Sequence, residues 1–234
     1  MVFSLRSMIG YPIRANDGDL GTVLDFYFDD VTWTIRYMVA ETGTRPSGRK
    51  VLISLVALGK PDWKSRTFSV NLTCDQVRNS PDINTERPVY RQHEVELHEY
   101  YQWPRYWEGG YGGTFGITPF PLFENNSGKE SSGSKQVGDP HLRSTHNVTG
   151  CHILATDGGV GYVGDFVVDG ETWTLRDLVV NTGKWLPGKK VLISPAWIKS
   201  FNWADSSICI DRSREAVKNC PEFDPLTPSG ISNE

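Results

Sequence analysis

The chain has 234 residues, a formal net charge of −4 at pH 7 and 38% hydrophobic residues. This charge argues against a nucleic-acid-binding protein, because phosphate contacts require a basic face. No apolar run is long enough to span a bilayer, and the N-terminus lacks a hydrophobic segment with a cleavage site. We therefore expect a cytoplasmic protein without a membrane span. Its four cysteines are irregularly spaced, which favours reduced thiols.

An internal repeat organises the chain. Shifted by 140 residues, the sequence matches itself without a gap, and 29 of the 85 pairs between residues 10–94 and 150–234 are identical. Self-similarity of this extent indicates a duplicated domain. It predicts a first copy at 1–94, an aromatic arm and Ser/Gly-rich linker at 95–141, and a second copy at 142–234. Each copy is large enough to fold alone.

Each copy is expected to consist of short strands and one short helix. An Asp-Gly turn, typical of hairpins, opens the pattern at Asp17 and again at Asp157. The strands predicted for the first copy are 22–29, 32–40, 50–54 and 67–71, and those of the second copy lie 140 residues later. Thr73 and Ser213 are predicted N-caps of helices over 74–79 and 214–219. This content predicts a mostly β fold of two tandem small β-barrels, each with one short helix, closed to remove sheet edges.

One acidic and one basic residue recur in each copy, on the first and second of these predicted strands. A two-residue turn at Asp30–Val31 would place Asp25 opposite Arg36, and the same arithmetic places Asp165 opposite Arg176. The preferred interpretation is a pair of cross-strand structural ion pairs, and the alternative is a ligand or proton site.

The order and spacing of turns resemble the PRC-barrel family. The pattern is G-x-x-(I/V)-x-x-x-D-G-x-x-G-x-V-x-D-F-x-x-D, then W-x-(I/L)-R-x-x-V, T-G and VLIS, and it occurs in both copies. This is the barrel of the cytoplasmic domain of the purple-bacterial photosynthetic reaction centre H subunit and of a ribosome-maturation factor. The resemblance implies a bacterial protein-binding or assembly module with no shared enzymatic activity. The H subunit's membrane helix and the maturation factor's N-terminal barrel are absent, so neither specific role transfers.

Clusters of histidine, cysteine or acidic residues match no established metal-site pattern. His93 and His98 are five residues apart, whereas two ligands on one helix face need a spacing of four. Two further clusters have unsuitable spacing, namely His141, His146, Cys151 and His152, and Asp17, Asp19, Asp25, Asp29 and Asp30. No nucleophile or phosphate-loop motif is present. We predict no metal, no cofactor, no catalytic residue and no enzymatic activity.

Basic residues precede the VLIS strand in both copies. They are Arg49, Lys50, Lys189 and Lys190. They are candidates for binding an anion, although so few charges release little counterion energy and a solvated loop is the favoured interpretation.

The segment after the first copy is rich in aromatic residues, which are enriched at interfaces. The interaction candidates are Tyr100, Tyr101, Trp103, Tyr106 and Trp107. The favoured hypothesis is that this arm docks internally, on the second copy or a second chain. The alternative is that it binds an external partner.

These observations predict a non-catalytic interaction or scaffolding protein, with a possible homodimer or a pseudo-two-fold packing of the copies. The alternative is a regulatory protein that binds a small ligand or anion in the cleft between the barrels. A cleft lined by basic residues would favour that alternative, and the expected ones are Arg36, Arg176, Lys50 and Lys190. No deep cavity is expected inside either barrel, because side chains fill barrels of this size.

Overall fold

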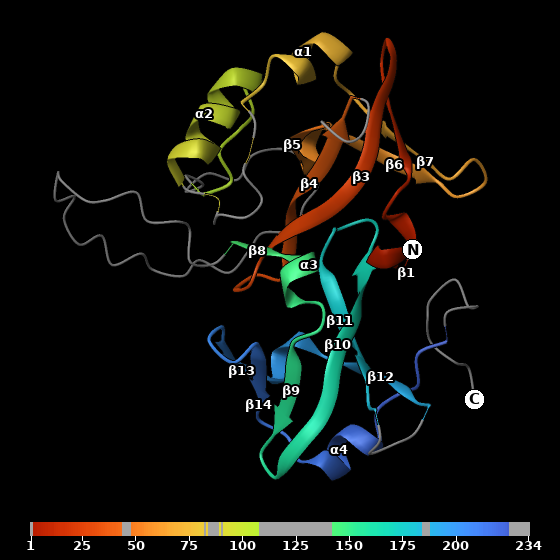
Figure 1. Cartoon of the computed structure of the whole chain (residues 1–234), viewed down its shortest axis with the longest axis vertical. Coiled ribbons are helices and arrows are strands. Elements are labelled where there is room, and N and C mark those ends of the chain that lie inside the picture. Colours follow the sequence, from red (N-terminus) through yellow and green to blue (C-terminus); the bar gives the residue numbers. More distant parts are fainter. Residues whose placement is uncertain are drawn as a thin grey trace, which may run out of the picture.

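The structure is a computed structural model, and it describes residues 2–43, 48–81, 83, 89, 91–107, 142–183 and 188–224. The protein is mostly β and contains two similar seven-stranded mixed sheets. One sheet occupies each half of the elongated molecule in Figure 1, with the first copy above and the second below.

The first sheet has the strand order β5-β4-β3-β2-β7-β6. Its strands are β2 (Pro12–Ala15), β3 (Gly18–Asp29), β4 (Thr34–Thr42), β5 (Arg49–Ser54), β6 (Leu58–Asp62) and β7 (Thr67–Val70). The turn η2 (Leu55–Ala57) follows β5, and α1 (Cys74–Arg78) follows β7. Thr73 caps α1 as predicted, because its hydroxyl accepts a hydrogen bond from the Gln76 amide.

The second sheet repeats this order as β12-β11-β10-β9-β14-β13. Its strands are β9 (His152–Ala155), β10 (Gly158–Asp169), β11 (Leu175–Asn181), β12 (Lys190–Ile193), β13 (Ile198–Asn202) and β14 (Ser207–Ile210). The turn η3 (Pro195–Trp197) follows β12, and α4 (Arg214–Lys218), capped by Ser213, follows β14. The predicted strands and the helix that follows them are confirmed in both copies.

The two copies exchange their first strands. In the first copy, β1 (Val2–Ser4) pairs with β10 of the second sheet, and the turn η1 (Leu5–Met8) follows it. In the second copy, β8 (Leu142–Ser144) pairs with β3 of the first sheet, and α3 (Thr145–Val148) follows it. The registers are equivalent, since Ser4 lies opposite Val167 and Ser144 lies opposite Tyr27. The copies are therefore related by a pseudo-two-fold axis within one chain.

The hairpin turns of the two copies also meet at this axis. The Ile35 amide donates to the Trp173 carbonyl at 2.9 Å, and the Leu175 amide donates to the Trp33 carbonyl at 2.7 Å. Trp173 packs against three rings of the first copy, with centroid distances of 5.9 Å to Phe3, 6.2 Å to Phe26 and 5.9 Å to Phe68. One continuous hydrophobic core therefore contains residues of both copies.

The sheets are not closed into barrels. Within the described residues, β5 and β6 end the first strand order without pairing with each other, and β12 and β13 do the same in the second. Through the exchange, β1 covers part of the β10 edge and β8 covers part of the β3 edge. The shared core buries one face of each sheet. The prediction of closed barrels is therefore wrong: the two sheets are open and mixed, and each receives one strand from the other copy.

Glycine is required where the backbone of the long strand in each sheet approaches its neighbouring strand most closely. Gly21 has φ +154°, and a Cβ there would lie 2.0 Å from the Glu41 carbonyl oxygen. Gly161 repeats the contact in the second copy, 2.0 Å from the Asn181 oxygen. A side chain at either position would force the strands apart.

The predicted ion pairs between Asp25 and Arg36 and between Asp165 and Arg176 are wrong. The β3–β4 turn has four residues instead of two, and a bulge leaves Arg36 between the Tyr27–Tyr37 and Phe28–Ile35 pairs. Asp25 consequently lies opposite Val39, and Asp165 lies opposite Val179. The basic residues find other partners, because Arg36 pairs with Asp29 at 3.3 Å and Arg176 with Asp177 at 3.8 Å.

Candidate functional site

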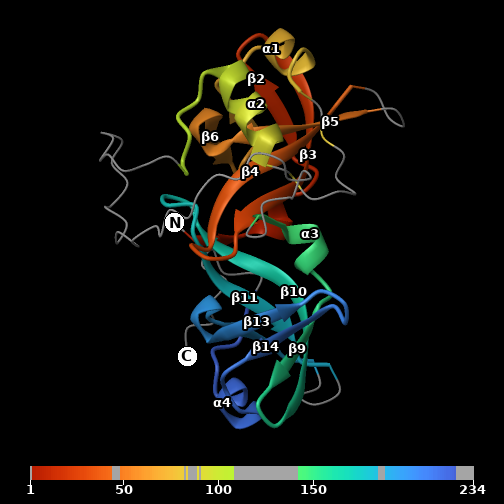
Figure 2. The same ribbon diagram turned by 90° about the vertical axis from the view of Figure 1, so that its left-hand side faces the viewer.

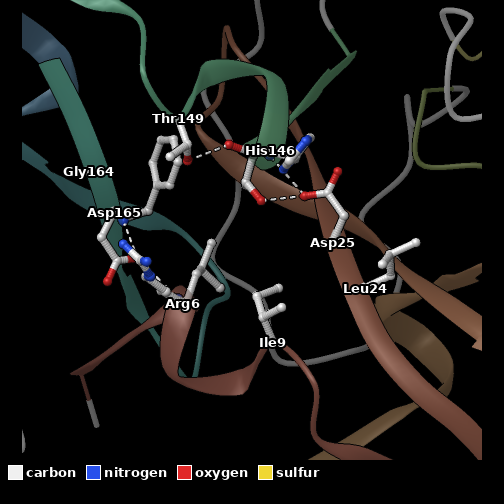
Figure 3. A pocket seen from close by; sticks show the side chains of 11 residues that line it. Arg6, Ile9, Leu24, Asp25, His146, Thr149, Gly164 and Asp165 are labelled. Atoms are coloured by element: carbon white, nitrogen blue, oxygen red, sulfur yellow. Dashed lines mark hydrogen bonds between the residues drawn. The ribbon is translucent and has the colours of Figure 1, made fainter.

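A cleft of about 250 Å³ lies on the pseudo-two-fold axis, between the long strands β3 and β10 and the turns that follow the exchanged strands (Figure 3). Its lining consists mainly of residues that are equivalent in the two copies. They are Leu5, Arg6, Ile9, Leu24 and Asp25, their counterparts Thr145, His146, Thr149, Gly164 and Asp165, and Phe166. The expected cleft between the copies therefore exists. None of its expected basic residues Arg36, Arg176, Lys50 and Lys190 lines it.

Asp25 is buried at a bulge of β3 and holds the start of α3 from the second copy. Its carboxylate accepts hydrogen bonds from the hydroxyls of Ser144 at 2.5 Å and Thr145 at 2.6 Å. The amides of His146 and Phe26 also donate to it, at 3.0 and 2.8 Å. Four donors thus compensate the desolvation of one buried carboxylate.

Asp165 of the second copy makes the equivalent contacts with the segment that follows β1 of the first copy. The Ser4 hydroxyl donates to it at 2.5 Å, and the amides of Arg6 and Phe166 donate at 3.0 and 2.7 Å. Burial nevertheless raises the pKa of Asp165 above its ordinary value, because the loss of hydration outweighs the hydrogen bonds and the charge of Arg6. Each copy therefore uses one aspartate to hold the exchanged segment of the other.

The raised pKa of Asp165 predicts how the stability of the fold depends on pH. An acid whose pKa is raised on folding stabilises the protein at low pH, and this contribution is lost as pH rises through the folded-state pKa. Asp165→Asn cannot ionise but keeps an oxygen that accepts from the Arg6 and Phe166 amides. We therefore expect the stability of this variant relative to wild type to increase as pH rises above the ordinary pKa of 3.8, measured by urea unfolding.

The substitution Asp17→Asn is a control for which we expect the opposite change of relative stability with pH. A hydrogen bond from the Cys74 amide lowers the pKa of Asp17, so its ionised form stabilises the fold as pH rises. The stability of Asp17→Asn relative to wild type should fall as pH rises toward 3.8, and it should stay constant at the higher pH where Asp165→Asn gains stability. A relative stability of Asp165→Asn that also falls would contradict the assignment.

The chemistry of the cleft comes from two hydrogen-bonded carboxylates and two basic side chains. Arg6 and His146 are both exposed and occupy equivalent positions in the two copies. Ile9, 42% exposed, adds apolar surface. Such a lining could hold a small polar ligand. Sequence reasoning missed Arg6 and the contacts of Ser4, although the identity of Ser4 with Ser144 at the repeat shift was a usable signal.

The aromatic arm packs on the first copy. The helix α2 (Arg91–Tyr101) crosses the outer face of the first sheet, as Figure 2 shows, and Leu97 packs against Tyr37, Val39 and Leu52. The expectation that the arm docks on the second copy or on a second chain is therefore wrong for its described residues, 95–107, which pack on the first copy. These residues give the first sheet a second buried face.

A buried polar cluster fixes the arm in place. The Tyr37 hydroxyl lies 2.8 Å from both Glu94 Oε1 and His98 Nε2, and the Tyr106 hydroxyl donates to Glu94 at 2.7 Å. His98 Nδ1 lies 3.0 Å from the Pro104 carbonyl oxygen. These contacts identify Glu94 and His98 as the residues of α2 that hold the arm on the first copy.

The five aromatic interaction candidates all lie on this docked arm. Trp103 stacks on Tyr101 at 4.1 Å, and Trp107 meets His98 at 4.9 Å. Tyr106 lies under the Arg36 guanidinium, 4.3 Å from the ring centroid. Tyr100 is the most exposed, at 40%, and its hydroxyl donates to the Gln76 carbonyl. Burial raises the pKa of Tyr101 to about 12.

The structure does not bring the four anion-binding candidates together. Arg49 and Lys50 lie on β5, in the upper half of Figure 1, whereas Lys189 and Lys190 lie at β12 in the lower half. Arg49 donates to the carbonyls of Arg78 and Ser80, at the end of α1. Lys189 pairs with Glu222 at 3.3 Å. These contacts make local structural roles the better interpretation.

The candidate metal clusters remain apart. His141 lies outside the described residues. Asp29 accepts amide hydrogen bonds from Val31 and Thr32 within its own turn, and Asp30 pairs with Arg143 at 2.7 Å. Across the described ranges there is no group of three or more histidine, cysteine or acidic residues that could hold a metal ion.

Comparisons with known proteins do not identify a family for this chain. A scan against protein-family models finds no match, and a search of curated proteins finds no significant relative. Among the described helices, none has the length and apolar character needed to cross a membrane.

Proposed function

We propose that this chain is a non-catalytic interaction or scaffolding protein of the cytoplasm and that its copies are variants of the PRC-type barrel. The repeated strand order supports the family resemblance, because the motif residues fall at equivalent turns of both sheets. The Asp-Gly turn joins β2 to β3, and the tryptophan of the second motif ends the β3–β4 turn.

The observation that carries this proposal is the use of repeated polar residues for assembly. Asp25 and Asp165, the repeated carboxylates of the motif, hold segments of the opposite copy. The buried histidine and glutamate of α2 likewise hold the arm. These buried polar groups join the parts of the chain into one body. Such a body is suited to present a surface to a protein partner.

The test is capture of a partner by the full chain from extracts of its source cells, followed by reconstitution from purified components. We expect a complex of fixed stoichiometry, with its mass measured by light scattering. If no complex can be reconstituted and a small molecule stabilises the chain instead, the scaffolding function is wrong.

The cleft supports a second candidate function, the binding of a small ligand or anion. The supporting observation is the pair of exposed basic side chains, Arg6 and His146, on its lining. Thermal unfolding with inorganic phosphate or citrate tests this candidate. It requires an increase in melting temperature that Arg6→Gln abolishes and Lys199→Gln, a change on the exposed face of β13, leaves intact.

A further inference from the structure

The contact between the two copies is reciprocal in detail. Ser4 donates to Asp165, and Ser144 donates to Asp25, each at 2.5 Å. The amide two residues after each serine donates to the same aspartate at 3.0 Å. Trp33 and Trp173 exchange backbone hydrogen bonds with the opposite hairpin. A contact in which the same residue types serve both sides is isologous, the geometry of a two-fold homodimer.

The first copy carries both halves of this contact. It has the donor, Ser4, the acceptor, Asp25, and the axial tryptophan, Trp33, which are identical to their counterparts in the second copy. We propose that the first copy is self-complementary and that the partner its contact surface fits is another first copy. In such a pair, β1 of one copy would add to β3 of the other, and Trp33 would take the place of Trp173.

The intact chain suppresses this pairing for two reasons. First, the second copy belongs to the same chain, so its pairing with the first copy is intramolecular and does not depend on the protein concentration. Second, one contact is specific to the mixed pair: Arg143 forms an ion pair with Asp30 at 2.7 Å, and both side chains are largely buried. The equivalent positions on the other side of the axis are Phe3 and Gly170, which carry no charge.

This asymmetry sets an order of preference among the possible pairs. A pair of second copies would place Arg143 against Gly170 and lose the ion pair. A pair of first copies would place Phe3 near Asp30 and lose the ion pair as well. Mixed pairs should therefore be preferred over both kinds of homodimer.

The experiment uses the full chain with a protease site inserted after Ser132, cut after folding, so that both fragments are present together. Native mass spectrometry then measures the mixed pair and the pair of N-terminal fragments. For wild type we expect the mixed pair to dominate, with the mass of the uncut chain. Arg143→Asp would face Asp30 with a like charge in the mixed pair, whereas the pair of N-terminal fragments does not contain residue 143.

We expect Arg143→Asp to raise the ratio of N-terminal homodimer to mixed pair by about tenfold, equivalent to ~1.4 kcal/mol. Lys199→Asp makes the same change of charge on the exposed face of β13 and should leave the ratio unchanged. Adding Asp30→Arg to Arg143→Asp should restore the mixed pair. The proposal is overturned if N-terminal fragments released by Arg143→Asp are monomers or aggregates, or if the cut wild type separates into monomers.

Discussion

Trp173→Ala is expected to lower the free energy of unfolding by about 3 kcal/mol, near the lower end of the range for a large aromatic residue in a core. Trp173 belongs to the second copy, but its ring lies among Phe3, Phe26 and Phe68 of the first. Removal of the ring leaves a cavity where the two copies share their core. The loss should appear as one cooperative transition in urea, because a single core cannot unfold by halves.

Tyr162→Ala provides the control. Tyr162 lies on β10 of the second copy and is 43% exposed. Its removal should lower the free energy of unfolding by less than about 1 kcal/mol. Equal effects of the two substitutions would show that Trp173 does not join the copies.

Asp25→Ala is expected to lower the free energy of unfolding by on the order of 3 kcal/mol, since several buried donors lose their charged acceptor at once. The hydroxyls of Ser144 and Thr145 and the amide of His146 would all be affected. Because these donors belong to the second copy, hydrogen exchange should rise first in β8 and α3. Urea unfolding measures the total loss, and exchange mass spectrometry locates it.

Asp19→Ala is the control for this carboxylate. Asp19 lies on the same strand, and its exposed side chain pairs only loosely with Arg14, at 3.6 Å. The stability change should stay within about 0.5 kcal/mol. A double-mutant cycle between Asp25→Ala and Ser144→Ala should give a non-additive result, and simple additivity would contradict a direct bond between the copies.

Local signals predicted most of the secondary structure. The Asp-Gly dipeptides form the predicted hairpin turns, and Thr73 and Ser213 cap α1 and α4 as predicted. These features depend on residues close together in the sequence, so turn and cap chemistry suffices to locate them. The repeat then carried each assignment from one copy to the other.

The register of the long hairpin could not be predicted in the same way. The Asp29 carboxylate accepts from the Val31 and Thr32 amides and so stabilises a four-residue turn, which ends at Trp33 with φ +55°. The additional bulge beside Arg36 shifts the pairing again. Each change moves a charged side chain away from its assumed partner, and no periodicity in the sequence reveals either one.

The candidate site depended on contacts between distant residues. Ser4 and Asp165 are 161 residues apart, and although the repeat marked Asp165, nothing in the sequence paired it with Ser4. The arm was recognised from its aromatic content, but its docking position depends on Tyr37, which lies on β4 beneath α2. Composition shows that such a segment needs a partner surface, whereas only the folded structure shows which surface it is.

The exchange of first strands has a consequence for synthesis of the chain on the ribosome. The β3 edge is complete only when β8 has been made, and β1 finds its place only after β10, which ends at Asp169. At ordinary translation rates, the nascent first copy waits roughly ten seconds between the emergence of β3 and that of β10. During that interval it presents an unpaired strand edge and part of its core to the cell. Two nascent chains on one messenger RNA would be close enough for their first copies to pair with each other. Chaperones that bind exposed apolar segments should therefore favour correct folding of this protein.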